Sequence, residues 1–250
     1  MIMRIPSDHL KTNNYKRMKY ILISILIFLI GCHEKDNHKT KSVELTNNLI
    51  KIEPEEHYVD STNIGLPNKY KIELKKFRTE DSVFVKIEFY EKQKSKWILK
   101  QHLQSSKDGI ISCDPKISDF NNDGFNDFTF KSSVAARGAN EIRNLYIFNA
   151  KNGQLQFIKN STYFPNMRYN NVLDCIDAFR VYGGCQTAFA KLESDSLREF
   201  ANVELFDKRI IITTIDKGGK TKEIKNEKFN DESFIRFSNY KPLKELKEEY

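Results

Sequence analysis

The chain has 250 residues, which suggests one domain with an extension, and its 18 Phe and 11 Tyr side chains are enough for a packed core. The formal net charge is +7, but residues 1–31 hold five basic side chains and one acidic one, so the remainder has 36 Lys and Arg against 33 Asp and Glu. The basic excess is therefore mostly N-terminal, no basic stripe interleaved with aromatic residues follows it, and no nucleic-acid partner is expected.

The first predicted element is an apolar segment that follows a basic one. Lys16, Arg17 and Lys19 precede residues 21–30, of which nine are strongly apolar. A basic region, an apolar run of this length and a small residue before a processing point are typical of a secretory signal. The run is shorter than the ~20 apolar residues of a membrane-spanning helix. The alternative is a buried core helix that happens to end in Gly-Cys.

The end of this segment, Leu29 to Cys32, resembles the lipobox of bacterial lipoproteins. The resemblance implies that the Cys32 thiol is acylated by diacylglycerol and that the chain is cut just before it. We therefore expect a lipoprotein signal peptide over residues 1–31 and a membrane anchor through the N-terminal lipid. Such an anchor would place the protein in the cell envelope, on the periplasmic side or at the cell surface.

The next segment, residues 32–66, is polar and has few large apolar side chains. Such a composition buries too little apolar surface to fold on its own. We predict that this segment is a flexible tether between the lipidated Cys32 and a folded domain.

From Tyr70 the sequence alternates apolar and polar residues with period two, as half-buried strands do. Similar short segments follow, and turn signals such as Asn152-Gly153 and Gly218-Gly219 separate them. We therefore predict a mainly β fold, an antiparallel sheet or sandwich-like domain of about ten short strands over residues 67–240. Residues 241–250 are expected to form a charged C-terminal tail, either a short helix or a frayed end.

A cluster of acidic and amide side chains lies within this predicted domain. Calcium prefers about six to eight oxygen ligands, and alternate positions of a tight loop aim their side chains at one centre. Positions 1, 3, 5 and 9 of such a loop are acidic or amide residues here, position 6 is the Gly that permits the turn, and the backbone carbonyl at position 7 can add a ligand. The predicted calcium ligands are Asp119, Asn121, Asp123, Phe125 through its carbonyl, and Asp127.

This loop is not an EF-hand, because that motif needs Glu at position 12, where the chain has Phe130. The pattern D-x-N-x-D-G-x-x-D resembles the calcium loop of FG-GAP and VCBS-type repeats, which implies a stiffened turn between strands without a catalytic role. The sequence holds one copy, whereas a propeller needs several. The alternative is a solvated turn without metal, but three carboxylates so close together would repel one another without a cation.

Three cysteines, Cys113, Cys175 and Cys185, remain after Cys32. An oxidising compartment allows one disulfide among them. Cys175 and Cys185 flank a segment that could fold back as a hairpin, so we predict that these two are paired. A bridge from Cys113 to either is the rival, and three unpaired buried cysteines are the other alternative.

Candidate catalytic residues are sparse. Of the five histidines only His102 lies in the predicted domain, and no G-x-S-x-G or H-E-x-x-H motif is present. We expect His102 to be a surface residue on a strand. The sequence therefore predicts a protein that is not an enzyme.

The second candidate site is the segment 132–149, where small residues surround an Arg-Gly pair between two predicted strands. A Gly-containing loop on a rigid β scaffold suits protein recognition. Together with the acidic loop, this segment resembles periplasmic β proteins related to the inhibitors of invertebrate-type lysozyme. Such inhibitors plug the enzyme's cleft with a short loop, and the resemblance implies that the comparable stretch here contains Ser132, Ser133, Arg137, Gly138 and Asn140. A plain interstrand loop is the alternative.

The sequence as a whole predicts a lipid-anchored, calcium-stabilised binding module whose partner is a protein or an envelope glycan. The predicted partner-binding residues are Ser133, Arg137, Gly138 and Asn140. The alternative is an inhibitor or immunity-type protein that blocks a cell-wall hydrolase such as lysozyme through the loop 132–141. A monomer is expected.

Overall fold

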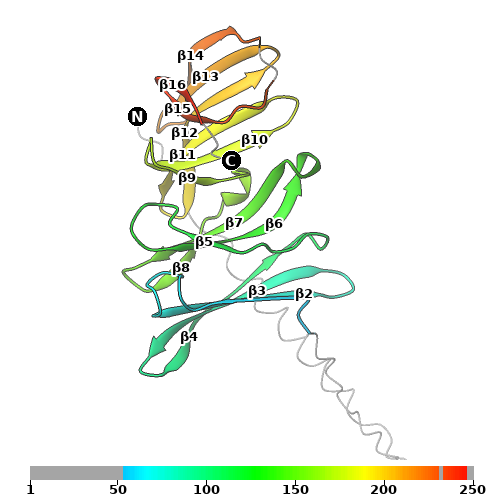
Figure 1. The fold of residues 1–250 in the computed structure, drawn as a ribbon, viewed down its shortest axis with the longest axis vertical. Helices are drawn as coiled ribbons and strands as arrows, with labels where there is room; N and C mark the ends of the chain where they lie inside the picture. The colour runs from blue at the N-terminus through cyan, green and yellow to red at the C-terminus, as the bar shows by residue number, and fades with distance from the viewer. Residues whose placement is uncertain (1–52, 231–232, 247–250) are drawn as a thin grey trace, which may run out of the picture. The chain divides into compact units, whose positions relative to one another are not determined.

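The computed structural model describes residues 53–230 and 233–246, which form a fold of antiparallel strands (Figure 1). This part of the chain contains sixteen strands in four sheets and two 3-10 helices of three residues each. None of its helices is long and apolar enough to cross a membrane. The predicted mainly β, antiparallel fold is confirmed, with more strands than the about ten expected from the turn signals.

The first sheet is a four-stranded meander in the order β1-β2-β3-β4. Along β2, the buried residues Tyr70, Ile72 and Leu74 alternate with partly exposed ones, as the period-two pattern predicts. One face of this sheet is therefore apolar and covers the second sheet. The strands are β1 (Glu56–Asp60), β2 (Tyr70–Arg78), β3 (Val83–Gln93) and β4 (Lys96–Ser106).

The second sheet lies next in the chain and is buried on both faces. Along β7, Tyr146 and Phe148 contribute to one apolar core, whereas Leu145 and Ile147 contribute to another. A strand covered on both faces needs apolar residues in succession, which explains the continuous run in this strand. The strands are β5 (Lys116–Ser118), β6 (Asp127–Ala135), β7 (Asn140–Asn149) and β8 (Gln154–Phe157), and the helix η1 (Ala136–Gly138) connects β6 to β7.

The third sheet has six strands in the order β14-β13-β12-β11-β10-β9, and a two-stranded ribbon, β15-β16, packs on it. Phe237 and Tyr240 of the ribbon share a core with Phe189 of β11. The strands are β9 (Arg168–Asn170), β10 (Cys175–Val181), β11 (Cys185–Glu193), β12 (Ser196–Phe206), β13 (Arg209–Ile215), β14 (Thr221–Lys228), β15 (Phe237–Tyr240) and β16 (Leu243–Glu245), with the helix η2 (Ser161–Tyr163) before β9.

Side-chain amides tie neighbouring sheets together. Three of them each accept a hydrogen bond from the backbone N–H of one residue and donate to the carbonyl of the same residue. Each pair satisfies a backbone donor and acceptor that face away from their own strand partners. The pairs, with distances of 2.6–3.0 Å, are Gln101 with Leu155, Asn140 with Val181, and Asn160 with Leu197.

The folded part of the chain begins earlier than the predicted boundary at residue 67. β1 pairs with β2, and Ile64 is fully buried in the first core. The sequence of β1 is polar because this edge strand packs mainly Tyr58 against the core. The predicted tether 32–66 is therefore wrong from residue 53 onward, whereas the predicted signal peptide and Cys32 lie outside the described residues.

The C-terminal tail also differs from its prediction. Residues 243–245 form β16, which pairs with β15 in place of a helix or a frayed end. The charged residues of this strand are compatible with a ribbon whose other face is solvated. Residues 247–250 lie outside the described part.

The predicted disulfide between Cys175 and Cys185 is absent, and all three cysteines of the described residues are free and buried. In the hairpin of β10 and β11, Cys185 lies opposite Val181, next to the turn, whereas Cys175 begins β10 at the open end. Six residues at ~3.4 Å each separate these positions by roughly 20 Å, beyond the ~7 Å that a disulfide spans between Cα atoms. Cys113 lies in a different core. The alternative of unpaired buried cysteines is the one observed.

Candidate functional site

The predicted calcium loop connects β5 to β6, and its own aspartates hold it in shape. Asp119 accepts hydrogen bonds from the backbone N–H groups of Asn121, Asp123 and Gly124, the last at 2.8 Å. Asp123 accepts one from the N–H of Phe125 at 2.9 Å. Gly124 has a φ angle of 84°, a conformation that favours glycine. The sequence pattern thus places four of the predicted ligands on one tight turn.

Asp127 is fully buried where the loop meets β6. Its Oδ2 accepts a hydrogen bond from the N–H of Phe120, and its Oδ1 accepts one from the N–H of Phe148 in β7, both at 2.8 Å. Burial raises the pKa of Asp127 to about 7, against the effect of these two hydrogen bonds and with a further rise from Asp123 and Asp119. The carboxylate therefore joins the loop to the central strand at a position where negative charge is unfavourable without a cation.

The residue types of the loop suit calcium, because carboxylate, amide and carbonyl oxygens are its preferred ligands. In the part of the chain that the structure describes, however, no group of three or more His, Cys, Asp or Glu side chains is arranged to hold a metal ion. The oxygens of Asp119 and Asp127 accept backbone hydrogen bonds instead. Calcium would be held by Asp119, Asn121, Asp123, Asp127 and the Phe125 carbonyl once these oxygens share one centre, and the site stays a prediction.

The loop also contacts the turn that follows β1. The N–H of Gly65 donates to the carbonyl of Asn126 at 2.9 Å, and the Asn126 amide donates to the carbonyl of Asn63 at 3.0 Å. A Cβ at Gly65 would lie 2.9 Å from the Phe148 ring, so only glycine fits. Stiffening the loop would therefore stiffen both the start of the fold and the central strands.

The predicted partner-binding residues lie on the hairpin of β6 and β7. Residues 135–139 at its tip are exposed, and Ala136, Arg137 and Gly138 have φ angles of 49°, 57° and 96°. Three successive residues with positive φ reverse the chain in a tight turn. Arg137 and Gly138 are therefore displayed to solvent, whereas Ser133 is partly buried within β6.

Asn140, the fourth predicted residue of this site, is buried and holds the hairpin in place through its paired hydrogen bonds to Val181. Asn166 adds a second connection, because it accepts from the N–H of Glu141 at 3.0 Å and donates to the carbonyl of Phe179 at 2.9 Å. These amides fix the base of the hairpin against β10. The structure thus gives Asn140 a positioning role.

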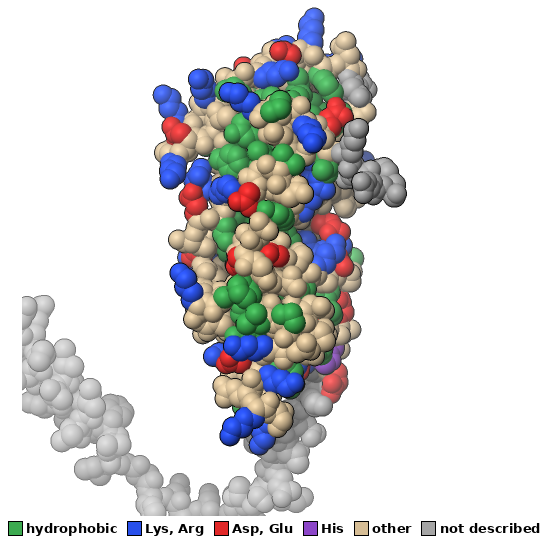
Figure 2. Space-filling view, turned by 60° about the vertical axis from the view of Figure 1, so that its left-hand side comes forward, with side chains coloured by type: hydrophobic (Ala, Val, Ile, Leu, Met, Phe, Trp, Pro, Cys, Tyr) green, Lys and Arg blue, Asp and Glu red, His purple; other side chains and the backbone are tan. Residues whose placement is uncertain are grey.

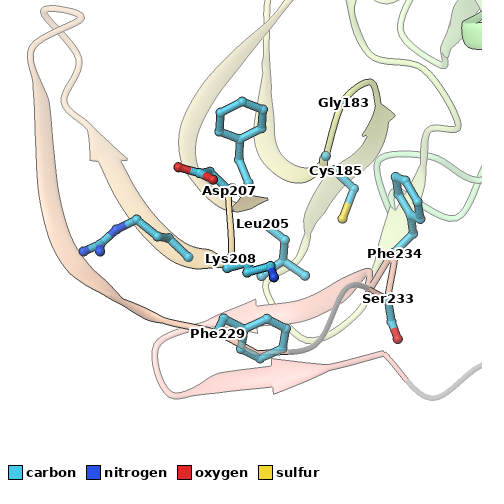
Figure 3. Close-up of a pocket in the computed structure, with 11 residues that line it drawn as sticks. Gly183, Cys185, Leu205, Asp207, Lys208, Phe229, Ser233 and Phe234 are labelled. Carbon is cyan, nitrogen blue, oxygen red and sulfur yellow. The ribbon is translucent and has the colours of Figure 1, made fainter.

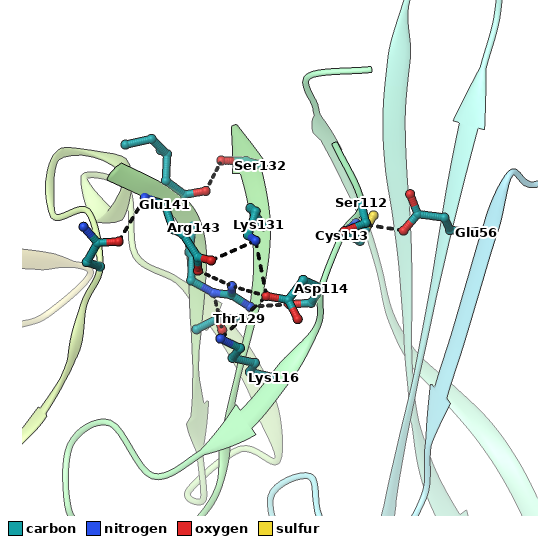
Figure 4. Close-up of polar contacts among 12 residues, drawn as sticks. Glu56, Ser112, Cys113, Asp114, Lys116, Thr129, Lys131, Ser132, Glu141 and Arg143 are labelled. Atoms are coloured by element: carbon teal, nitrogen blue, oxygen red, sulfur yellow. Dashed lines mark hydrogen bonds and ion pairs between the residues drawn. The ribbon is translucent and has the colours of Figure 1, made fainter. Parts of the chain in front are cut away.

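An ion-pair network around the buried Arg143 also supports the hairpin (Figure 4). The Arg143 side chain is 4% exposed and contacts Asp114 at 3.0 Å and Glu141 at 3.2 Å, while Lys131 contacts Glu141 at 2.8 Å. Burial opposes ionisation of Asp114, but the contacts with Arg143 hold the pKa of that carboxyl below its usual value. The network joins β6, β7 and the segment before β5.

The sequence analysis did not predict that the connection between β4 and β5 exposes a large apolar side chain. Ile110 in this connection is 94% exposed, although it is a large apolar residue. The signal that could have revealed it is the pair of isoleucines directly after Asp108-Gly109, a dipeptide typical of a turn. Apolar side chains at a turn have no strand face on which to be buried.

The described surface has several hollows, two of which are a pocket in the third sheet and a groove along β6. One is a pocket beside the turns that end β10 and β12, with Cys185, Leu205 and Phe229 among its lining residues (Figure 3). Burial raises the pKa of the Cys185 thiol. The other is a groove between β4 and β6 whose lining includes hydroxyl and amide groups, among them Gln104, Ser105, Ser106, Ser132, Ser133 and Thr162.

The remaining polar surface is mixed in charge. Figure 2 shows Lys and Arg side chains interspersed with Asp and Glu on the face that it draws. His102, a strand residue as predicted, lies on β4 with half of its side chain exposed, and its Nδ1 is 3.8 Å from Glu88. The predicted sites thus occupy opposite ends of β6, with the acidic loop before the strand and the hairpin tip after it.

Comparisons with known proteins add little to this geometry. No family model matches the sequence, and no curated protein matches it. Among solved structures, the chain is similar to one described as a "Xanthomonas Type IV Secretion System related protein", with 11% sequence identity and a TM-score of 0.45. The similarity covers 70% of this chain and 98% of that chain. At this level it supports no inference about function.

Calcium should raise the melting temperature of protein first stripped with a chelator, because a ligand that binds only the folded state stabilises it. At about 100 times the dissociation constant the expected rise is roughly 5–10 °C by scanning calorimetry. Asp123→Asn should abolish the rise. The matched control is Asp216→Asn, because Asp216 accepts backbone hydrogen bonds in another exposed turn. No rise for the wild-type protein in millimolar calcium would defeat the calcium prediction.

The raised pKa of Asp127 predicts a pH dependence in the absence of calcium. The folded state favours the protonated acid, so this stabilising contribution is complete below pH ~4 and is lost as the pH rises through about 7. The Asn amide of Asp127→Asn can accept only one of the two backbone hydrogen bonds, so this variant should start below wild type at pH 4. Its stability relative to wild type should then rise with pH over this window, by up to about 4 kcal/mol. Urea unfolding in chelator between pH 4 and 9 measures the difference, and parallel curves for the two proteins would contradict it.

Proposed function

We propose that this protein is a lipid-anchored module of the bacterial cell envelope that binds a protein or an envelope glycan. The N-terminal sequence supports the anchor, since a basic region, an apolar run and Gly31-Cys32 follow one another as in lipoprotein signals. The envelope side of the membrane follows from that signal. Binding rather than catalysis is proposed because Arg137 and Gly138 are exposed on a turn of a β scaffold.

The observation that carries the proposal is the hairpin tip of β6 and β7. Its backbone is in the left-handed region. Its base is held by Asn140, Asn166 and the Arg143 network, and Arg137 is exposed at the tip. A tip fixed before binding loses little conformational entropy when a partner contacts it. Arginine is enriched among the residues that dominate protein interfaces.

Calcium is proposed as the stabilising ion. The acidic loop lies at one end of β6 and the hairpin tip at the other, so the ion would act through the rigidity of the sheet and not through contact with the partner. A cation beside Asp127 would offset the cost of burying its negative charge at the junction between the loop and β7.

The groove between β4 and β6 supports a glycan as the partner. Its hydroxyl and amide side chains are of the kind that hydrogen-bond sugar hydroxyls, and Phe157 is 38% exposed at its edge. Ser133 belongs both to this groove and to the predicted partner-binding set. The groove and the hairpin therefore form one continuous candidate surface along β6.

A second candidate function is an inhibitor or immunity-type protein that blocks a cell-wall hydrolase such as lysozyme. The favouring observation is the projecting, rigid tip 136–138, since a fixed convex loop suits the concave cleft of a hydrolase. In this candidate, Arg137 would enter the cleft. The two candidates share the same surface and differ in the partner.

The anchor is tested by metabolic labelling with a radioactive or clickable palmitate in a bacterial host. The wild-type protein should incorporate the label and fractionate with membranes, because the thiol of Cys32 is the predicted acylation site. Cys32→Ser should lose the label and accumulate as the uncleaved precursor. Persistent labelling of that variant would refute the anchor.

The hairpin is tested with purified lysozymes of the different classes as probes. We expect the protein to inhibit at least one of them and Arg137→Ala to weaken inhibition about tenfold, as for an arginine at the centre of an interface. The matched control is Lys217→Ala at the exposed turn of β13 and β14, which should leave inhibition unchanged. If no class of lysozyme is inhibited, the second candidate fails and the envelope binding module stands.

A further inference from the structure

The first sheet has a second face, opposite the apolar one that covers the second sheet. In β2 and β3 buried residues alternate with partly exposed ones, so every second side chain belongs to this second face. The strand register fixes which of these side chains are neighbours across the sheet. We call it the outer face, and its residues are Lys71, Glu73, Lys75 and Phe77 of β2, Phe84, Lys86, Glu88, Tyr90 and Lys92 of β3, and Trp97, Leu99, His102, Gln104 and Ser106 of β4.

At one end of the outer face, a lysine lies over a pair of aromatic rings. Phe77 of β2 and Phe84 of β3 are directly opposite each other, and their rings stack with centroids 5.5 Å apart. The Lys86 ammonium lies 5.2 Å from the Phe77 centroid and 5.7 Å from the Phe84 centroid. Both rings are partly exposed. An aromatic ring attracts a cation but carries no net charge, so this ammonium keeps its full charge for an anion.

The other end of β3 repeats this arrangement. Lys92 lies opposite Trp97 of β4, and its ammonium is 5.6 Å from the centroid of the indole ring. Trp97 is partly exposed. Neither the Lys86 ammonium nor the Lys92 ammonium forms an ion pair with a described residue. The two lysines are six residues apart on one strand, which separates them by roughly 20 Å at ~3.4 Å per residue.

Between these ends the charges of the outer face cancel. Lys71 and Lys75 contact Glu73 at 2.5 and 3.1 Å, and Lys75 also contacts Glu88 at 3.2 Å. The hydrogen bond from Lys71 lowers the pKa of Glu73, so this carboxylate is ionised and paired. Two lysines and two glutamates thus neutralise one another around the Tyr90 ring. The face presents one free positive charge at each end and a neutral centre.

The outer face is continuous with the groove between β4 and β6. Gln104 and Ser106 are among the residues that line this groove. The strand register places Gln104 opposite Lys86 and Ser106 opposite Phe84. Side chains that are directly opposite in neighbouring strands have Cβ atoms about 5 Å apart. A chain molecule bound in the groove therefore reaches Lys86 by crossing a single strand.

We propose that the outer face binds an acidic glycan in which carboxylated sugars are separated by neutral ones. The carboxylates bind Lys86 and Lys92, and the sugar rings pack on Phe77, Phe84 and Trp97. The inference rests on the proposed function, because it takes the glycan as the partner. It adds the charge of that glycan and a surface beyond the groove.

The spacing of charge favours such a glycan over a nucleic acid or a lipid surface. A single-stranded nucleic acid carries a phosphate at every nucleotide and binds grooves that are positive along their length. Anionic membranes attract clusters of about four to eight basic side chains. The outer face has two unpaired lysines and a neutral centre, which suit neither. Carboxylates form charge-assisted hydrogen bonds with lysine, and exposed rings offer sugars a flat apolar surface.

Trp97 is the single tryptophan of the chain, so its fluorescence reports on this face. The full-length protein in detergent micelles is titrated with a hyaluronate oligosaccharide, in which carboxylated and neutral sugars alternate. The same oligosaccharide with all carboxylates methyl-esterified is the uncharged control. The acid form should change the Trp97 emission and reach saturation. The ester should bind at least tenfold more weakly, because it offers the lysines no negative charge.

Lys86→Gln and Lys92→Gln should each weaken binding of the acid form about tenfold, because each removes a charge-assisted hydrogen bond. The matched control is Lys222→Gln on the edge strand β14, which should bind within about twofold of wild type. All three variants should melt at the wild-type temperature, since the replaced lysines form no ion pair with a described residue.

Equal binding of the acid and the ester, or no binding of either, would overturn the inference. Tighter binding of oligothymidylate or of phosphatidylglycerol vesicles would overturn it as well, in favour of a nucleic acid or a membrane. A glycan that binds by calorimetry but leaves the Trp97 emission and both lysine variants unaffected would also overturn it. The proposed function would stand in that case, because the glycan would then be bound in the groove.

Discussion

A sheet that is apolar on both faces has to be covered on both faces, and the sheet of β5 to β8 imposes this requirement on the rest of the fold. Tyr146 and Phe148 face one core and Leu145 and Ile147 face the next. The first sheet, which has one apolar face, and the third sheet therefore pack on either side of it. At ~25 cal/mol per Å² of apolar surface, this double burial stabilises the central strands. Because apolar packing holds the faces of the sheets together, the side-chain hydrogen bonds between sheets lie at strand ends and edges.

Buried polar groups at those edges are satisfied by side chains, because strands of different sheets cannot pair directly. Gln101, Asn140 and Asn160 each reproduce the donor and acceptor of a strand partner. Asp127 differs from these amides because it only accepts: its two oxygens accept hydrogen bonds from the loop and from β7. A neutral amide makes such a connection at no electrostatic cost, whereas a buried carboxylate needs a proton or a cation. This difference is the physical reason to connect the acidic loop with calcium.

The two ends of β6 have different roles, because the start of the strand is buried and the hairpin tip at its other end is exposed. At its start, the buried carboxylate and the acidic loop form a junction that also holds the turn after β1. At its end, the hairpin tip extends from a base held by Asn140, Asn166 and Arg143, and Arg137 is exposed. Rigid bases and exposed tips favour recognition, because the entropy of ordering is spent during folding and not during binding. The surface that we propose for a partner is therefore a consequence of how the second sheet is held.

The sequence by itself determined the features that depend on local pattern and turn chemistry. Alternation along β2 and β3 predicted the strands, and Asn152-Gly153 and Gly218-Gly219 predicted the turns. The spacing of Asp119, Asn121 and Asp123 predicted a tight loop, and in the structure the Asp119 carboxylate accepts hydrogen bonds from the backbone of that loop. Only the tertiary structure decided that the polar strand β1 belongs to the fold, that Cys175 and Cys185 lie far apart, and that Asn140 holds the hairpin. It alone left Ile110, in the connection between β4 and β5, exposed to solvent. Strand pairing and loop placement depend on contacts between residues distant in the chain, and no local pattern encodes those contacts.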